Sequence, residues 1–178
     1  MIEQLRSQDK AIELLEKSGC STSVIRHCKT VAKLAIKIAR ILQRRGFEVD
    51  TELVETGALL HDIGRSKTHS VDHAIVGARI IESAGMSNAI ARIIERHVGG
   101  GIPQDEAVKL GWPEKNYLPE TLEERIVAYA DKLVEGNKRV PINETIGQLS
   151  RKLGKNHPSI ARLKALDKEF QSLLDESL

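Results

Sequence analysis

The chain has 178 residues, of which 40 % are hydrophobic and 29 % are charged, and its formal net charge is +2. This length and composition are those of one ordinary globular domain with a sizeable core. The small net charge does not indicate nucleic acid or a membrane as an obligatory partner, and two cysteines, Cys20 and Cys28, exclude a disulfide framework. The charged N-terminal segment lacks the apolar core of a signal peptide. We therefore expect a soluble, cytoplasmic protein.

In the first half of the chain, apolar residues recur at helical spacing, and no convincing strand-like alternation appears. Glycines at 19, 46, 64, 85 and 99–101 are placed to end successive helices. The expected helices cover residues 7–18, 21 or 23 to 45, 51–62, 70–84 and 88–97.

The second half begins with a loop-rich segment, 102–120, that contains a short expected helix near 104–110. The next helix, 121–135, opens with the capping-box pattern Thr121-Leu122-Glu123-Glu124. Two tail helices follow, one from an Asn143 cap to Leu153 and one from Ser159 onward, after Pro158. The prediction is an all-α fold in a single domain, 1–178.

Several polar residues lie where the apolar pattern predicts core-facing surface: His27, His61, Asp62, His97 and Asp131. A lone buried histidine is usually a core residue whose hydrogen bonds are satisfied. A buried carboxylate is harder to explain, because it is costly unless a cation compensates it. Imidazole and carboxylate ligands from several helices suit one or two divalent ions of zinc, iron, manganese, cobalt or nickel.

The stretch HDIGRSK, residues 61–67, resembles the signature of the HD superfamily of phosphohydrolases in its HDIG variety. The resemblance covers about residues 20–138 and leaves 139–178 as a helical C-terminal extension. It implies that His27, His61, Asp62 and Asp131 ligate metal in a helical core. It also implies a metal-dependent phosphohydrolase that uses activated water to cleave a nucleotide or another small phosphoester.

A narrower resemblance is to the HD-type hydrolases of diadenosine tetraphosphate, which hold two metals. His73 and His97 match the two additional histidines of that group, and Asp62 would then bridge the two ions. Gly77, one turn after His73, would let another helix or an ion approach. The adjacent histidines of the cyclic-dinucleotide branch are missing, since Val98 follows His97, and this argues against cyclic-di-GMP hydrolysis.

Four further residues are candidates for substrate contact: Arg65, Lys67, Lys132 and Gly99. The arginine can bind phosphate oxygens bidentately, and it joins Asp62 as a candidate catalytic residue. The lysines can equally be solvated cations. The glycine triplet 99–101 can admit a phosphate to backbone amides or simply cap a helix.

Other features have plainer interpretations. A basic stripe on the second expected helix, 29–44, is more typical of a solvated surface than of a nucleic-acid interface. His69 and His157 are expected at the surface. The apolar stripe from Ile160 to Leu173 can pack on the domain or join subunits in a homo-oligomer. The alternative function is a catalytically silent, nucleotide-binding regulatory HD module.

Overall fold

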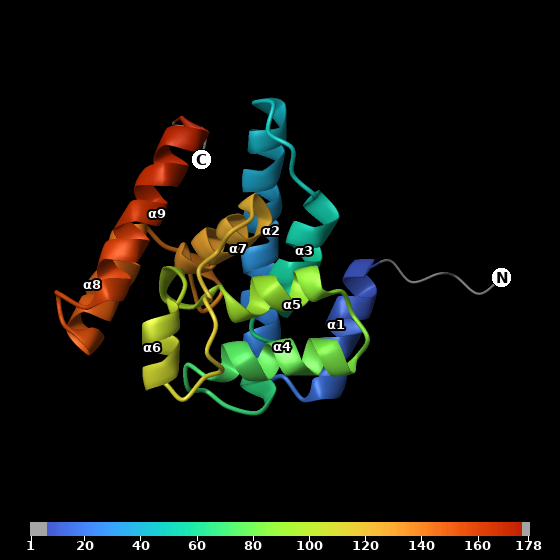
Figure 1. Cartoon of the computed structure of the whole chain (residues 1–178). Coiled ribbons are helices and arrows are strands. Elements are labelled where there is room, and N and C mark those ends of the chain that lie inside the picture. The colour runs from blue at the N-terminus through green and yellow to red at the C-terminus, as the bar shows by residue number, and fades with distance from the viewer. Residues whose placement is uncertain (1–6, 176–178) are drawn as a thin grey trace.

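Helices form nearly all of the secondary structure in residues 7–175, the part of the chain that the computed structural model describes (Figure 1). The all-α prediction is therefore confirmed. The α-helices are α1 (Ser7–Ser18), α2 (Thr22–Arg44), α3 (Thr51–Leu60), α4 (His73–Ser83), α5 (Asn88–Glu95), α6 (Gln104–Lys109), α7 (Leu122–Lys132), α8 (Ile142–Leu153) and α9 (Pro158–Leu174). Shorter elements are the 3₁₀ helices η1 (Ile63–Ser66) and η2 (Val98–Gly100) and the strands β1 (Val134–Glu135) and β2 (Lys138–Arg139).

Helix α2 is the longest element and stands upright through the middle of the molecule (Figure 1). It begins where the Ser21 side chain accepts a hydrogen bond from the backbone N–H of Val24, so the structure selects Ser21 from the two caps, Ser21 and Ser23, that the sequence allowed. One stripe of this helix is buried and packs against α3 and α7. His27 lies in the second turn, so that its ring reaches the layer between these helices.

Two expected helices end earlier than the apolar pattern indicated, and each ends one or two residues before a histidine. Helix α3 ends at Leu60 instead of Asp62, and α5 ends at Glu95 instead of His97. In each case the histidine Nδ1 lies 2.6–2.7 Å from the carbonyl oxygen three residues earlier, Ala58 or Ile94. The ring competes for a carbonyl that the next helical turn would use, and this helps to end the helix.

Helix α7 opens with the predicted capping box between Thr121 and Glu124. Arg96 forms an ion pair with Glu124 at 3.0 Å, which holds the beginning of α7 against the end of α5. The helix ends at Lys132, three residues before the predicted end. The chain then forms a two-residue antiparallel hairpin, β1–β2, that turns at Gly136 with a φ of +59°.

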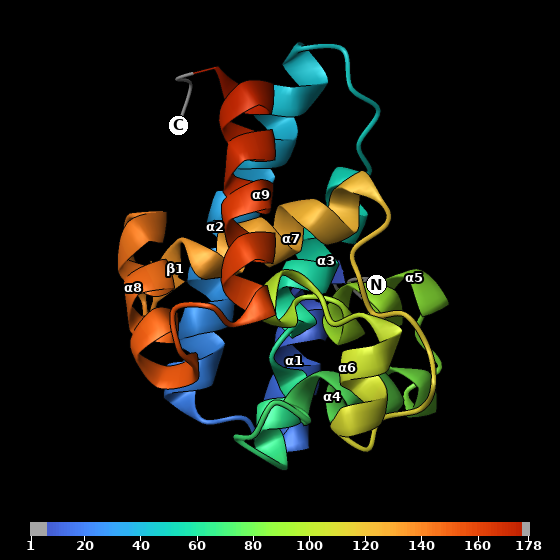
Figure 2. The same ribbon diagram turned by 60° about the vertical axis from the view of Figure 1, so that its left-hand side comes forward.

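Helices α8 and α9 lie on one side of the core, with α9 crossing α7 in Figure 2. Helix α8 begins after Pro141, not at an Asn143 cap, and His157 caps α9 by accepting from the N–H of Ser159. The Phe170 ring stacks on Tyr129 of α7 at 4.5 Å between centroids. The C-terminal apolar stripe therefore packs on the domain itself. No helix in residues 7–175 is both long and apolar enough to cross a bilayer.

Candidate metal centre

The turn between α3 and α4 brings Asp62 and His73 together through two glycines. A Cβ on Gly64 would lie 1.9 Å from the carbonyl oxygen of His73 and 2.7 Å from the backbone nitrogen of Gly77. Only glycine at position 64 therefore lets η1 contact α4 this closely. A Cβ on Gly77 would meet the Ile94 side chain at 2.8 Å, so this glycine makes room for a helix and not for an ion.

Gly64 therefore has a different role from the one that the sequence indicated. It was expected to end the third helix, but it lies inside η1 with its neighbour Ile63 buried. The close contact at this glycine places the Nε2 atom of His73 3.1 Å from Oδ1 of Asp62.

Four histidines point the same ring nitrogen into the site. In each ring Nδ1 lies within 2.7 Å of a backbone carbonyl oxygen, which can only accept a hydrogen bond: Gly136 for His27, Ala58 for His61, Ser70 for His73 and Ile94 for His97. The proton of a neutral ring therefore sits on Nδ1 and leaves a lone pair on Nε2. This is the ring state and the outer hydrogen bond of a metal-ligating histidine.

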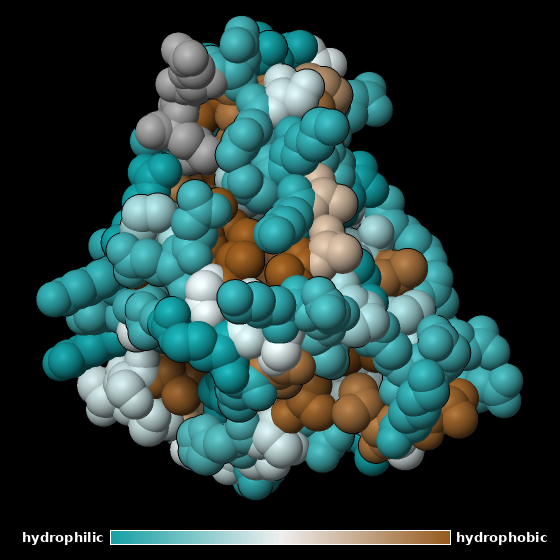
Figure 3. All heavy atoms as spheres, turned by 90° about the vertical axis from the view of Figure 1, so that its left-hand side faces the viewer, coloured by the Kyte–Doolittle hydropathy of each residue, from teal (hydrophilic) through white to brown (hydrophobic). Residues whose placement is uncertain are grey.

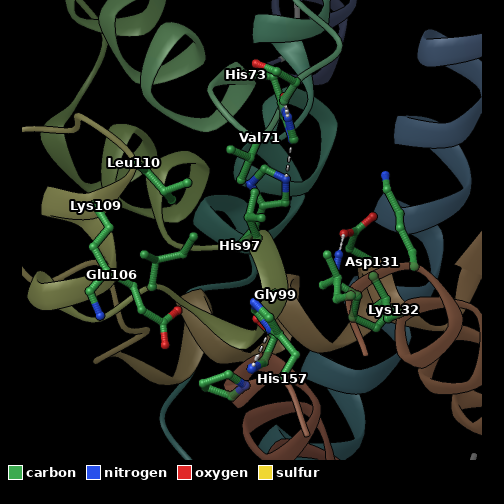
Figure 4. A pocket seen from close by; sticks show the side chains of 18 of the residues that line it. Val71, His73, His97, Gly99, Glu106, Lys109, Leu110, Asp131, Lys132 and His157 are labelled. Carbon is green, nitrogen blue, oxygen red and sulfur yellow. Dashed lines mark hydrogen bonds and ion pairs between the residues drawn. The ribbon is translucent and has the colours of Figure 1, made fainter. Parts of the chain in front are cut away.

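The Nε2 atoms converge without enough hydrogen-bond donors among them. Those of His73 and His97 lie 3.2 Å apart, although both carry lone pairs in this ring state (Figure 4). His61 Nε2 and Asp62 Oδ1 are buried and lack a hydrogen-bond partner. Unpaired buried acceptors are costly, and a cation among them would satisfy all of them at once.

The carboxylates divide the site into two parts. Oδ2 of Asp62 faces the Nε2 atoms of His27 and His61 at 3.9 and 3.8 Å, and Oδ1 faces those of His73 and His97 at 3.1 and 3.6 Å. Oδ1 of Asp131 lies 3.0 Å from His27 and 3.3 Å from His61. Asp62 is thus the shared member of both parts.

The shorter of these distances, 3.0–3.3 Å, fit coordination of divalent ions, whereas the separations of 3.6–3.9 Å are longer than those of adjacent ligand atoms on a single ion. Ligand atoms about 2.1 Å from one ion lie about 3.0–3.4 Å from each other. Two groups of three side chains could hold an ion: His27, His61 and Asp131, and His61, Asp62 and His97. The residues present therefore suit a divalent metal, and the donor set of nitrogen and oxygen matches the metals expected from the sequence.

The protonation of the site indicates how strongly it attracts positive charge. Burial lowers the pKa of His97 to about 4. Burial is the largest single influence on His61 and acts to lower its pKa, but the charges and hydrogen bonds of Asp62, Cys28 and Asp131 together outweigh it and raise that pKa well above the usual value. Burial is the largest single influence on Asp62 and acts to raise its pKa, but His61, His73 and His97 together outweigh burial and hold the pKa well below its usual range. A buried site that keeps its carboxylates ionised needs a compensating cation.

Two cationic side chains extend from the centre into a cavity of about 690 Å³. Nε of Arg65 lies 2.7 Å from Oδ2 of Asp62, and Nζ of Lys132 lies 2.6 Å from Oδ2 of Asp131. Lys67, also expected to contact substrate, is exposed and is not one of the residues that line this cavity. The structure thus brings two of the three predicted cations to the site.

The glycine triplet lies where the cavity meets α9. Gly99, Gly100 and Gly101 all have positive φ angles, and Gly99 lines the cavity. A Cβ on Gly99 would approach the Ser159 hydroxyl to 3.2 Å, and one on Gly100 would approach Arg162 to 3.2 Å. The glycines therefore let α9 contact η2, a role that the sequence alone did not indicate.

The outer half of the cavity comes from residues that sequence reasoning passed over. They lie on or beside α6, α8 and α9: Lys109, Leu110, Leu149, Lys152, Leu153 and His157. His157 was expected at the surface, but it is partly buried, lines the cavity and caps α9. His69 is exposed, as expected, and also lines the cavity. No motif marks these positions, because they meet only through the packing of α9 on η2.

Residues 24–135 match the HD domain family. The chain belongs to this family. Over 166 residues this HD protein is 49 % identical to an uncharacterised protein of Methanocaldococcus jannaschii, covering 93 % of this chain and 98 % of the relative. It is 38 % identical along its whole length to a tRNA (cytidine(56)-2′-O)-methyltransferase of Picrophilus torridus, of which it spans 50 %.

A solved structure shares the fold of this HD protein. The HD domain of the phosphodiesterase PgpH from L. monocytogenes, in complex with cyclic-di-AMP, aligns with a TM-score of 0.56 and 15 % identity. The alignment covers 95 % of this chain and 99 % of that domain. At this identity the likeness establishes the helical architecture.

Proposed function

We propose that this HD protein is a metal-dependent phosphohydrolase that cleaves a nucleotide or another small phosphoester. One observation carries the proposal. The two oxygens of Asp62 face two separate pairs of histidines, and His61 Nε2 and Asp62 Oδ1 are buried without a hydrogen-bond partner. In this proposal His27, His61 and Asp131 would hold one divalent ion, His73 and His97 would hold a second, and Asp62 would be available to both. This is the arrangement implied by the resemblance to the diadenosine tetraphosphate hydrolases.

A divalent metal bound there lowers the pKa of a water molecule toward neutrality and polarises the phosphoryl group. The remaining steps belong to side chains of the chain itself. Arg65 donates a hydrogen bond from Nε to Asp62, which leaves its terminal nitrogens available to phosphoryl oxygens. Lys132 adds a second positive charge at the opposite carboxylate. Both neutralise charge that develops on the phosphoryl group, which is a main requirement of phosphoryl transfer.

The comparisons support this reading at the level of substrate class. A protein of the same fold is named a phosphodiesterase and was solved with cyclic-di-AMP, a nucleotide. The cavity beside the metal centre, about 690 Å³, is within the size range of small-ligand sites.

A nucleotide-binding regulatory module without catalytic turnover is the second candidate. It is favoured by the P. torridus relative, in which a segment like this chain makes up half of a protein named as a tRNA methyltransferase. A domain attached to another enzyme can serve that enzyme by binding alone. The two candidates differ in one measurable property, which is the hydrolysis of bound nucleotide.

The test is to purify the protein, measure its bound metals, and assay a panel of nucleotides and simple phosphoesters with and without chelator. We expect turnover that chelator abolishes, and loss of both metal and turnover in His61→Ala and Asp62→Ala. The control is Asp167→Asn, which changes a carboxylate that binds the Tyr129 hydroxyl away from the cavity. Turnover that survives both alanine variants would overturn the proposal. Nucleotide binding without any turnover would favour the regulatory module.

A further inference from the structure

We infer that α8, α9 and the end of α6 form a recognition subsite in the outer half of the cavity. This subsite would bind the nucleoside part and a second phosphate of a nucleoside polyphosphate. The inference rests on the proposed function for the inner end, where the scissile phosphate would lie. It adds a specific role for the segment after residue 135, which lies outside the family match.

The two ends of the cavity are lined by different kinds of side chain. The inner end is formed by His73, His97, Asp131 and the cations beside them, and the close-up shows α6 facing them across the cavity (Figure 4). On or beside α6, α8 and α9 the lining adds apolar side chains, Leu110, Leu149, Leu153 and Pro158, among the polar side chains of Lys109, Lys152 and His157. A single phosphate group would leave this outer part empty, so the shape and chemistry fit a ligand with an additional apolar part.

The two sides of the outer half carry the same pair of residue types. Lys109-Leu110 ends α6, and Lys152-Leu153 ends α8. Leu110 and Leu153 are exposed to 43 % and 42 %, and they are two of the four exposed large hydrophobic residues found in residues 7–175. Apolar side chains are visible among polar ones on this face of the molecule (Figure 3). Apolar surface that lines a groove can be covered by a bound ligand.

The available charge at this end is positive. Glu106 also lines the cavity, but Arg162 neutralises it with two hydrogen bonds of 2.8 and 2.7 Å. Asp105 lies 3.8 Å from Lys109 on the same helix. Within residues 7–175, Lys152 forms no ion pair or hydrogen bond, so its ammonium group is available to a second phosphate.

The lining also indicates what the subsite would not distinguish. In the described part of the chain, no phenylalanine, tyrosine, tryptophan, asparagine or glutamine side chain lines the cavity. Leucines contact any planar base through apolar surface, and stacking on a ring such as that of His157 also tolerates any base. Base identity is usually read by hydrogen bonds to the base edge, for which asparagine and glutamine amides are well suited. We therefore expect little preference between purine and pyrimidine nucleotides.

The wall formed by α8 and α9 is held in place before any ligand binds. Arg162 of α9 donates hydrogen bonds to Glu106 of α6. The Thr145 hydroxyl of α8 donates a hydrogen bond to the carbonyl oxygen of Lys132 at 2.8 Å. Gly99 and Gly100 allow the direct contact of α9 with η2. A preformed wall costs little ordering when the ligand binds.

The test measures equilibrium binding to the metal-loaded protein by isothermal titration calorimetry. The probes are α,β-methylene-ADP, AMP, α,β-methylene-UDP and inorganic phosphate. We expect Lys152→Ala to raise the Kd of the diphosphate analogues about tenfold and Leu153→Ser to raise the Kd of every nucleotide about three- to tenfold. Neither change should alter the Kd of inorganic phosphate by more than about twofold.

Two matched controls accompany these variants. Lys155→Ala removes an exposed lysine three positions away that does not line the cavity, and Val108→Ser removes an exposed apolar side chain on α6 that lies outside it. Both should leave all four affinities unchanged.

Unchanged nucleotide affinities in Lys152→Ala and Leu153→Ser, or no nucleotide binding at all, would overturn the subsite. Its failure and that of the proposed function are separable. Hydrolysis with an unaltered KM in both variants would leave the metal centre assigned and remove the subsite. Nucleotide binding that depends on Lys152 but is not followed by hydrolysis would support the subsite and contradict the proposed hydrolase function.

Discussion

The inner and outer ends of the cavity are built in different ways. At the inner end every histidine is fixed by a second hydrogen bond to a backbone carbonyl, and the carboxylates are nearly inaccessible to solvent. At the outer end, Lys109, Leu110, Lys152 and Leu153 are exposed, and Lys152 has no partner within residues 7–175. Fixed, buried ligand atoms suit the precise geometry that catalysis needs. Exposed side chains suit the recognition of ligands that vary in structure.

Because the two ends are built differently, we expect mutations at the two ends to have effects of different size. Removing one buried ligand leaves others uncompensated, so the inner end should respond steeply and as a unit. Removing one exposed side chain at the outer end should weaken ligand binding only by the contribution of that side chain to the binding free energy. The following changes test this contrast, from the largest expected effect to the smallest.

The largest effect is expected from Asp131→Asn at the inner end. The substitution keeps the shape of the side chain but removes the charge that faces His27 and His61 at 3.0 and 3.3 Å. We expect kcat/KM to fall by about a thousandfold or more, because the charge holds the metal and its ligands. Asp50→Asn is the control, since asparagine also caps a helix well. Equal losses of kcat/KM in Asp131→Asn and Asp50→Asn would contradict a special role for the Asp131 carboxylate.

Removal of metal should destabilise the fold through the same residues. A ligand present at about 100 times its Kd stabilises a protein by about 2.7 kcal/mol, which corresponds to about 5–10 °C in Tm for a chain of this size. We expect a chelator to lower the Tm of the wild-type protein by this amount. In Asp62→Ala the chelator should have almost no effect. A wild-type Tm that is insensitive to chelator would contradict a stoichiometric metal.

Arg65→Ala should lower kcat/KM about ten- to a hundredfold, because it removes a charged hydrogen bond to Asp62 and a contact for phosphoryl oxygens. Arg65→Lys should recover part of this loss by restoring the charge without the bidentate geometry. Lys67→Ala is the matched control, and we expect less than about a twofold change because Lys67 lies outside the cavity. A larger effect at Lys67 than at Arg65 would reassign the phosphate contact.

The smallest effect concerns the attachment of the outer wall. Arg162→Ala removes the partner of Glu106, and both side chains are only about one-fifth exposed. We expect the free energy of unfolding, measured in urea, to fall by about 1–2 kcal/mol. Arg151→Ala, at an exposed position on α8, should change it by less than about 0.5 kcal/mol. Similar values for the two arginines would show that the ion pair does not hold the wall.

The inner end could be predicted from the sequence because its residues conflict with their surroundings. Asp131 and His61 interrupt apolar helical patterns, and such interruptions are informative without a structure. The helices around them were also predictable, since caps such as Ser21 and the box at Thr121 follow local rules. The ends of α3 and α5 were not, because the rings of His61 and His97 compete for helical carbonyls.

The outer end could not be predicted, because no local rule places it. Lys152 and Leu153 read as the ordinary end of an amphipathic helix, and His157 as a residue before a proline. They line the cavity only because Gly99 and Gly100 admit α9 and because Arg162 reaches Glu106, 56 positions away in the sequence. Such contacts depend on tertiary packing, and helical periodicity in the sequence carries no information about which helices pack together.

Anomalous X-ray diffraction from crystals soaked in Mn²⁺ tests the metal centre most directly. Two peaks should flank the Asp62 carboxylate, one beside His27 and His61 and the other beside His73 and His97. Peaks confined to exposed carboxylates such as Asp105, with none within coordinating distance of Asp62, would contradict the assignment.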